Sequence, residues 1–314
     1  MSLKLRKIYR FLRSGSPHTR DYLAYKKFLT ESSHYYKTSY FNLTIDLELA
    51  WTRARRGDGI TTNEESLEKS HRARTVLPTL LELSEKYQLP ITFAVIAHVA
   101  LSDCATHDKS APFKPYWAKS DWYDLDPHSN LELNQDYYGA DLLTEIKNSS
   151  INHEIASHGF THVDLGDSET TRVVAQFEIG QSEEILRKIN EDLSTFIFPN
   201  NNVAYVDLLK EFGFTTYRVK QNQEIKKDSL GLYQFPNGLW ISPQAFSNQD
   251  LVYLIDKGVS RKQLINFWCH LFEFDSPREF TSFFEPIFSH IESQREQGII
   301  EVHTMKDIVR KVNE

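Results

Sequence analysis

Two histidines near the middle of the chain have the residue type and the spacing of metal ligands. His158 and His162 are four residues apart and follow the segment 151–156, which contains Ile151, Ile155 and Ala156. We expect a strand that ends near Ala156 and the opening turn of a helix directly after it. On a helical turn this spacing places both imidazoles on one side, where they can reach the same ion. The alternative is a pair of histidines that only form hydrogen bonds at a helix start.

Two acids near residue 45 supply a second set of metal-type side chains. Asp46 and Glu48 alternate with Leu43, Ile45 and Leu47, which is the pattern of a β-strand. Their spacing of two places both carboxylates on one face of that strand. Two imidazoles and two carboxylates match a divalent metal site that keeps one acid for proton transfer.

The elements around these residues alternate between strand and helix patterns along the chain. Repeated βα units predict a parallel sheet, either an open doubly wound sheet or a closed barrel. In the strand predicted at 264–272, His270 shares one face with Asn266 and Trp268. His270, His158 and the two acids all fall at the carboxyl ends of their strands. In either architecture this edge of the sheet is where ligands bind.

Composition limits the classes of function. The 314 residues carry a net charge of -7, so no basic field is present to attract nucleic acid. Only two cysteines are present, which argues against a disulfide scaffold and for a reducing compartment. There is no apolar run of about 18 residues and no apolar segment of a secretory signal after the N-terminal charges. We therefore predict a cytoplasmic location.

The first 38 residues have a different character from the rest. Residues 1–13 interleave apolar side chains with basic ones. Such a segment is typical of an amphipathic helix at an anionic membrane surface, so we predict peripheral membrane contact there. The alternative is a helix that caps the main domain with its charges in solvent. We assign residues 1–38 to an N-terminal extension and residues 39–314 to the main domain.

The motifs, taken together and in order, resemble the polysaccharide deacetylase family, carbohydrate esterase family four. Residues 44–48 resemble the variant of its first motif with the form Asp-x-Glu. Residues 157–162 match its His-x-x-x-His motif, with Gly159 in place of a hydroxyl residue. Residues 196–201 stand where an Arg-x-Pro motif is expected, but the arginine is absent. Residues 268–270 look like its last motif, a histidine at a strand end.

The resemblance implies a fold, a cofactor and an activity. The fold is a distorted (β/α) barrel of about seven or eight units, and the cofactor is a divalent metal, most often zinc. The activity is removal of an N- or O-acetyl group from a sugar of a polysaccharide or glycolipid precursor. Glu48, His158 and His162 would hold the metal, and Asp46 would be the base that takes a proton from metal-bound water. His270 would be the acid that protonates the leaving group, unless it is a core-edge histidine beside Trp268.

Five further residues are candidates for binding the carbohydrate substrate. Asn200 and Asn201 occupy the place of the missing arginine and could hydrogen-bond the base or the sugar. Arg218, at the end of the next strand, could contact the sugar or replace that arginine. Trp268 and Trp51 could stack on a sugar ring, although core packing explains Trp51 equally well.

Two other functions are consistent with these motifs. One is a glycan-binding protein without activity on a decayed deacetylase fold, which the missing arginine and the altered motifs would explain. The other is a metal-dependent amidase with a substrate that is not a sugar. The sequence makes no prediction of the oligomeric state.

Overall fold

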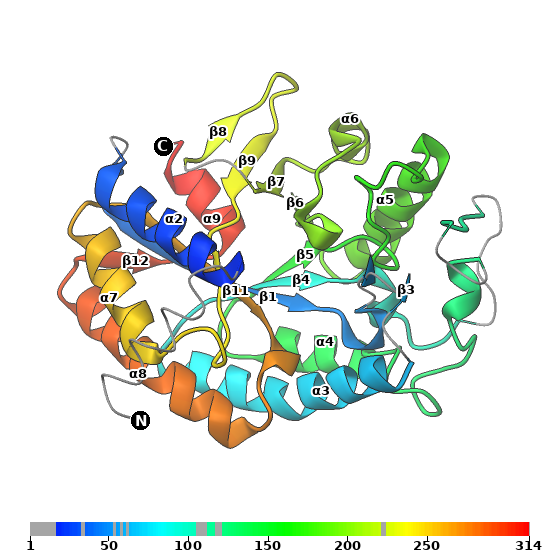
Figure 1. Ribbon diagram of the computed structural model, residues 1–314, viewed down its shortest axis with the longest axis horizontal. Coiled ribbons are helices and arrows are strands. Elements are labelled where there is room, and N and C mark those ends of the chain that lie inside the picture. The colour runs from blue at the N-terminus through cyan, green and yellow to red at the C-terminus, as the bar shows by residue number, and fades with distance from the viewer. Residues whose placement is uncertain are drawn as a thin grey trace.

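The protein is built around one curled, mostly parallel sheet (Figure 1). The computed structural model describes residues 17–32, 35–52, 55–56, 59–60, 63–104, 112–116, 121–220 and 224–313. The ten strands of this sheet are β1 (Ser39–Leu47), β4 (Thr92–Val95), β5 (Glu154–Ser157), β6 (Thr195–Phe196), β7 (Thr216–Val219), β8 (Lys226–Lys227), β9 (Tyr233–Pro236), β10 (Leu239–Trp240), β11 (Leu264–His270) and β12 (Ile300–Val302). Two short strands, β2 (Arg55–Arg56) and β3 (Gly59–Ile60), form a separate hairpin pair.

The order of the strands is β10-β11-β1-β4-β5-β6-β7-β9-β8, and β12 pairs with the start of β1. All of these pairs are parallel except β8 with β9. Within the described residues no strand pair joins the β10 end to the β8 end, so the sheet forms a half-barrel. The predicted barrel-like α/β fold is confirmed, in this open form.

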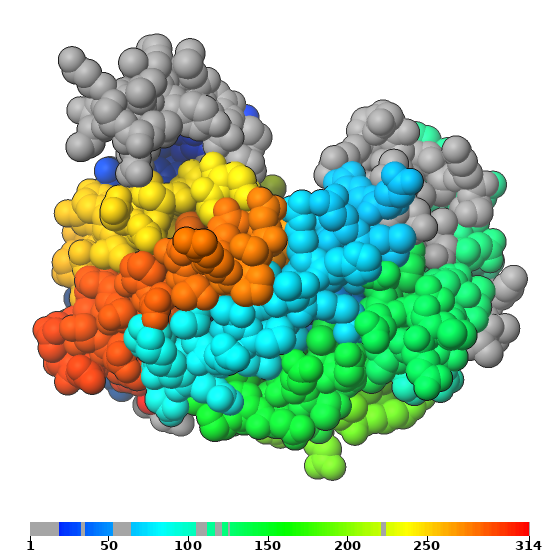
Figure 2. All heavy atoms as spheres, turned by 90° about the horizontal axis from the view of Figure 1, so that it is seen from below, coloured from blue at the N-terminus to red at the C-terminus, as the bar shows by residue number. Residues whose placement is uncertain are grey.

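The helices are α2 (Pro17–Glu31), α3 (Asn63–Lys86), α4 (Ala140–Asn148), α5 (Arg172–Arg187), α6 (Val206–Glu211), α7 (Asn248–Val259), α8 (Pro277–Glu296) and α9 (Met305–Lys311). Short 3-10 turns are η1 (Leu49–Trp51), η2 (Ala97–Ala100), η3 (Tyr123–Leu125), η4 (Pro199–Asn201) and η5 (Leu271–Glu273). Helix α3 packs against α8, and α8 packs against α7. The three helices lie on one face of the molecule (Figure 2). No helix in the described ranges is long and apolar enough to cross a bilayer.

Strand β1 is the centre of the sheet because it pairs with β11, β4 and β12. All nine of its residues are buried, as expected for a parallel strand covered on both faces. Its outward apolar side chains join the main core with the surrounding helices. Inside the curl, Met305 and Ile308 of α9 pack with inward strand residues and fill the space below the carboxyl edge.

The register of the strands brings distant residues to one level. Leu47 pairs with Val95, which pairs with Ser157, and Phe196 and Tyr217 continue this row on β6 and β7. The next residue on β1, β5 and β7 is Glu48, His158 and Arg218 respectively. Because side chains alternate along strands, these residues face the inside of the curl at the carboxyl edge. On the other side of β1, Asp46 pairs directly with His270.

Helix α2 covers the open side of the sheet near β10 and packs on α7. The Asn266 backbone N–H of β11 donates to the Tyr25 hydroxyl at 2.8 Å, so this helix completes the hydrogen bonding of the strand. This contact agrees with the alternative prediction for the N-terminal extension, in which a helix caps the main domain. The basic segment 1–13 lies outside the described residues, and the division at residue 38 stays a prediction.

Candidate metal centre and active site

The segment that carries His158 and His162 is a loop, which corrects the expected helical turn. Strand β5 ends at Ser157, and the next helix, α5, begins only at Arg172. Gly159 has φ +80° and His162 has φ +67°, so the backbone turns twice into the left-handed region. Glycine adopts this conformation without steric cost, which accounts for Gly159 where the family motif has a hydroxyl residue. The loop still places the two rings side by side, with centroids 5.1 Å apart.

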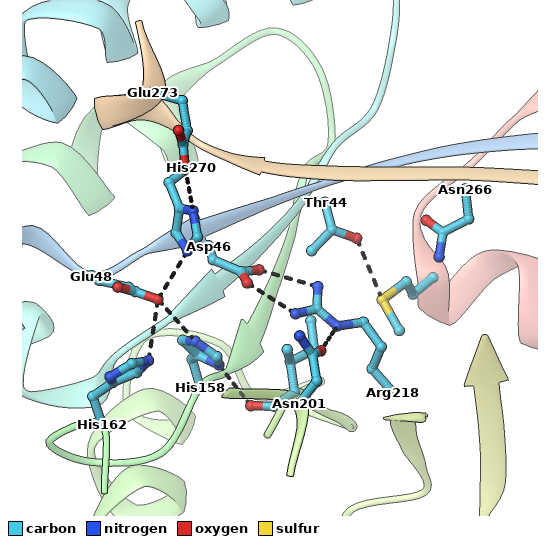
Figure 3. Close-up of polar contacts among 12 residues, drawn as sticks. Thr44, Asp46, Glu48, His158, His162, Asn201, Arg218, Asn266, His270 and Glu273 are labelled. Carbon is cyan, nitrogen blue, oxygen red and sulfur yellow. Dashed lines mark hydrogen bonds and ion pairs between the residues drawn. The ribbon is translucent and has the colours of Figure 1, made fainter. Parts of the chain in front are cut away.

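Three imidazoles from two parts of the chain converge on a single carboxylate oxygen (Figure 3). Glu48 Oε1 lies 3.3 Å from His158 Nε2 and 3.2 Å from His162 Nε2. His270 Nε2 is 3.3 Å from the same oxygen. Burial raises the pKa of Glu48, but the charges of His162 and His270 and the hydrogen bonds outweigh it and hold the pKa well below its usual value. Glu48 is therefore an anion at neutral pH.

The hydrogen bond of His158 determines which of its ring nitrogens can bind a cation. His158 Nδ1 lies 2.7 Å from the backbone carbonyl oxygen of Ile197, which can only accept a hydrogen bond. Nδ1 of neutral His158 thus carries the proton, and Nε2 presents a lone pair to the Glu48 carboxylate. Nε2 and the carboxylate oxygen then repel each other unless a proton or a metal ion lies between them. A buried lone pair held in place by a backbone carbonyl is the usual arrangement of a metal-binding histidine.

The donor set fits a divalent metal. One ligand atom from each of Glu48, His158 and His162 lies within 4.8 Å of the others. Two imidazole nitrogens and one carboxylate oxygen are the protein ligands of many catalytic zinc sites, which keep a further position open. The histidines were predicted as ligands from their spacing and Glu48 from the family resemblance, and the fold brings the three residues together.

Asp46 sits beside this cluster and is held by an arginine. Arg218 NH2 and NH1 donate to its two carboxylate oxygens at 2.9 and 3.2 Å. Burial raises the pKa of Asp46, but the Arg218 guanidinium and the nearby His158 lower this pKa by a larger amount. The net shift of the Asp46 pKa is therefore downward. Asp46 is ionised and able to accept a proton. Arg218 of β7 thus places a cation beside Asp46, which residues 196–201 do not supply.

His270 lies on the opposite side of Glu48 from the two loop histidines. Its Nδ1 is 3.3 Å from Glu273 Oε1, so carboxylates face both ring nitrogens. Burial lowers the pKa of His270, but Glu48 and Glu273 outweigh it and raise the pKa to about 10. In this environment His270 carries a proton that it can donate. Glu273 was not predicted from the sequence, although its spacing of three residues from His270 is a signal that could have identified it.

Comparisons with known proteins agree with this arrangement. Residues 65–217 match the sequence model of the polysaccharide deacetylase family. The resemblance to the polysaccharide deacetylases is confirmed. The matched segment contains His158 and His162, whereas Asp46, Glu48 and His270 lie outside it and join them only in the folded chain. The Asp-x-Glu form of the first motif therefore stays a resemblance.

Several solved structures share the fold of this chain. A protein from Mycobacterium smegmatis assigned as a polysaccharide deacetylase is 14% identical, with a TM-score of 0.58 over 88% of this chain and 91% of that chain. One from Pseudomonas aeruginosa PAO1, with the same assignment, is 11% identical with a TM-score of 0.59 over 86% and 89%. The Puue allantoinase is 12% identical with a TM-score of 0.58 over 86% and 89%. No curated protein matches by sequence.

The structure places the residues predicted to bind substrate in different surroundings. Trp51 is wrong, because it is fully buried and its indole N–H donates to the Tyr137 carbonyl at 3.3 Å. Asn200 donates to Asp164 at 3.3 Å, an acid outside the cluster of Asp46, Glu48 and the histidines. Asn201 accepts a hydrogen bond from Arg218 Nε at 3.0 Å. Of the two roles considered for Arg218, these contacts favour replacement of the family arginine over direct sugar binding.

Trp268 remains a candidate for substrate contact. Its ring packs against the Arg218 guanidinium, with 4.9 Å between the guanidinium carbon and the ring centroid. It also meets the His270 ring edge-on at 5.7 Å. The tryptophan therefore touches both the residue that holds Asp46 and the residue that carries the proton.

Removal of the Arg218 charge is expected to shift the pH profile of the enzyme. In Arg218→Gln the pKa of Asp46 should rise, because burial is no longer opposed by the guanidinium. A base with a higher pKa is protonated and inactive up to a higher pH, so the acid limb of kcat/KM should move upward by about one to three pH units. The measurement is kcat/KM between pH 4 and 9. Arg218→Lys, which retains the charge, should shift much less, and identical profiles for all three proteins would contradict the assignment.

Proposed function

We propose that the protein is a metal-dependent hydrolase that removes an acetyl group from an N-acetylated or O-acetylated sugar of a polysaccharide or glycolipid precursor. The match of residues 65–217 to the polysaccharide deacetylase family supports a hydrolase that acts on acetyl or amide groups. The observation that carries the proposal is the convergence of His158 Nε2 and His162 Nε2 on the Glu48 carboxylate, with His158 Nδ1 held by the Ile197 carbonyl. Two imidazoles and one carboxylate arranged in this way match the protein ligands of a catalytic metal site.

Glu48, His158 and His162 would hold the metal, most often zinc in such a donor set. A bound divalent ion polarises the acetyl carbonyl and lowers the pKa of water towards neutrality. Asp46, ionised beside Arg218, accepts the proton of the attacking water. His270, protonated between Glu48 and Glu273, donates a proton to the nitrogen or oxygen of the leaving sugar.

The ion pair between Asp46 and Arg218 also bears on the reading of the fold as a decayed, inactive deacetylase. That reading depended on the absence of a cation beside the base. Arg218 NH2 lies 2.9 Å from Asp46 and supplies the cation from another strand. This ion pair favours an active hydrolase over the inactive glycan-binding protein.

The proposed function is tested by acetate release from a panel of N-acetylated and O-acetylated sugars and of amides that are not sugars. The purified protein is loaded with zinc, and a matched sample is stripped with chelator. We expect acetate from at least one sugar and loss of that activity in the stripped sample. Turnover of the amides alone would identify the amidase, and sugar binding without turnover would identify the inactive glycan-binding protein.

The role of His270 should depend on the leaving group. An amine departs poorly as an anion, so an acetamide needs the proton from His270, whereas 4-nitrophenyl acetate has a leaving group that needs none. In His270→Ala we expect kcat for the acetamide to fall by about 10²- to 10⁴-fold. Hydrolysis of the aryl ester should fall far less. An equal loss with both substrates would show that His270 acts on a step other than protonation.

A further inference from the structure

Side chains of metal-ligand type also gather just beyond the end of β4. One ligand atom from each of His98, Cys104 and Asp126 lies within 4.8 Å of the others. None of the three belongs to the proposed active site. Imidazole nitrogen, thiolate sulfur and carboxylate oxygen all bind zinc, and a thiolate favours zinc over magnesium or calcium. The cluster therefore has the donor chemistry of a zinc site that contains sulfur.

The spacing of the polar atoms suits a shared ion. Bond lengths of about 2.0–2.3 Å in a tetrahedral zinc site place neighbouring ligand atoms about 3.3–3.6 Å apart. His98 Nε2 lies 3.2 Å from Asp126 Oδ2, and His128 Nδ1 lies 3.4 Å from the same oxygen. A hydrogen bond between His98 and Asp126 would explain the first distance, but it does not account for a thiol and a second imidazole at the same carboxylate.

The surroundings fix the orientation of two of these ligands. The Tyr138 hydroxyl donates to Asp126 Oδ1 at 3.1 Å, and the Ser129 backbone N–H donates to that hydroxyl at 3.0 Å. Asp126 therefore presents its other oxygen to the imidazoles. The His98 ring packs against the rings of Trp51 and Tyr138, with centroids 4.5 and 5.3 Å away. Hydrogen bonds behind a ligand and an apolar shell around it are typical of metal sites.

The cluster joins the two ends of a segment that has few regular elements. Between η2 and α4 the described residues contain one 3-10 turn, η3, and one isolated bridge, Asp103 with Asn130. The Cys104 backbone N–H donates to the Ser129 carbonyl at 2.9 Å, which brings the thiol to the neighbourhood of Asp126. Closing so long a segment costs conformational entropy, and a bound ion offsets this cost because it binds only the closed chain.

His98 also connects the cluster to the loop of the active-site histidines. The backbone N–H groups of Ala97 and His98 donate to the carbonyls of Gly159 and Phe160 at 2.9 and 3.0 Å. An ion that fixes η2 would therefore support one side of the loop 158–162.

We propose that His98, Cys104 and Asp126 bind a second zinc ion, with His128 as the fourth ligand. His98 and Asp126 have fully buried side chains, whereas 34% of the His128 side chain is exposed, so the ion enters from the side of His128. Four protein ligands close a zinc site to water, which is the pattern of a structural ion. The ion stabilises the segment between η2 and α4 and takes no part in hydrolysis. This inference does not depend on the proposed deacetylase function.

The second site is tested by loading the metal-free protein with cobalt(II), which replaces zinc and absorbs in the near ultraviolet when a thiolate binds it. The proposed active-site ligands contain no sulfur, so this band reports the second site alone. We expect the band in the wild-type protein and its loss in Cys104→Ser, which changes one atom. Cys269→Ala removes the other cysteine of the chain and should keep the band.

Zinc content after dialysis provides the second measurement. Cys104→Ser should bind about one zinc ion per chain fewer than the wild-type protein. An absent thiolate band, a band that survives Cys104→Ser, or equal zinc contents would overturn the second site even if the protein releases acetate. A band that depends on Cys104 in a protein that releases no acetate would uphold the second site and overturn the deacetylase activity.

Discussion

Asp46→Asn is expected to lower kcat by about 10²- to 10⁴-fold, the usual contribution of a general base. An amide cannot accept a proton at neutral pH, yet it has nearly the shape of the carboxylate and can still bond Arg218 through its oxygen. The binding of substrate should change little, because Arg218 and Trp268 stay in place. The measurement is kcat and KM for acetate release together with the metal content of the same sample.

Asp164→Asn is the matched control, because Asp164 is another acid near the carboxyl edge that bonds Asn200 and Asn202 instead of the cluster. It should keep the full kcat. Metal retained with activity lost in Asp46→Asn would separate the proton acceptor from the metal ligands. Full activity in Asp46→Asn would remove Asp46 from the role of base.

His158→Ala is expected to reduce the bound metal by about one ion per chain and to abolish turnover. The variant removes one of three protein ligands and leaves Glu48 with a cluster of two imidazoles. The measurement is metal content by mass spectrometry after dialysis, followed by activity with added zinc. Retention of metal and activity would show that the ion is absent from this cluster or is held by other residues.

A second group of side chains needs a control in this experiment. His98, Cys104 and Asp126 also have ligand atoms within 4.8 Å of one another, and none of the three belongs to the group of Glu48, His158 and His162. Cys104→Ser should leave the activity intact. If Cys104→Ser lowers the metal content but keeps turnover, whereas His158→Ala abolishes turnover, an ion at Cys104 is distinct from the ion that turnover requires.

The sequence predicted the strands of the site because each has a clear pattern of its own. The alternation around Asp46 and Glu48 placed both acids on one face of β1, and the same reasoning placed His270 at the end of β11. The helical turn at His158 was wrong because a spacing of four residues is compatible with a loop as well as a helix. Gly159, which adopts a positive φ, was the signal for the loop.

The partners of the base could not be predicted because they depend on contacts between strands distant in sequence. Asp46 and Arg218 are separated by 172 residues and meet only through the curl of the sheet. Alternation along β7 shows which way Arg218 faces but not which residue it reaches. Trp51 could not be assigned for the same reason, because an aromatic residue after a strand can face either the core or the ligand. Cytoplasmic location and membrane contact by residues 1–13 stay predictions.

The shared level of Glu48, His158 and Arg218 has a consequence for how the protein can vary. One residue inserted into β1, β5 or β7 would turn the following side chain to the outer face of the sheet and dismantle the centre. Insertions in the connections between these strands leave that alignment intact. Changes in substrate range are therefore open to the loops at the carboxyl edge, while the lengths of the strands are fixed.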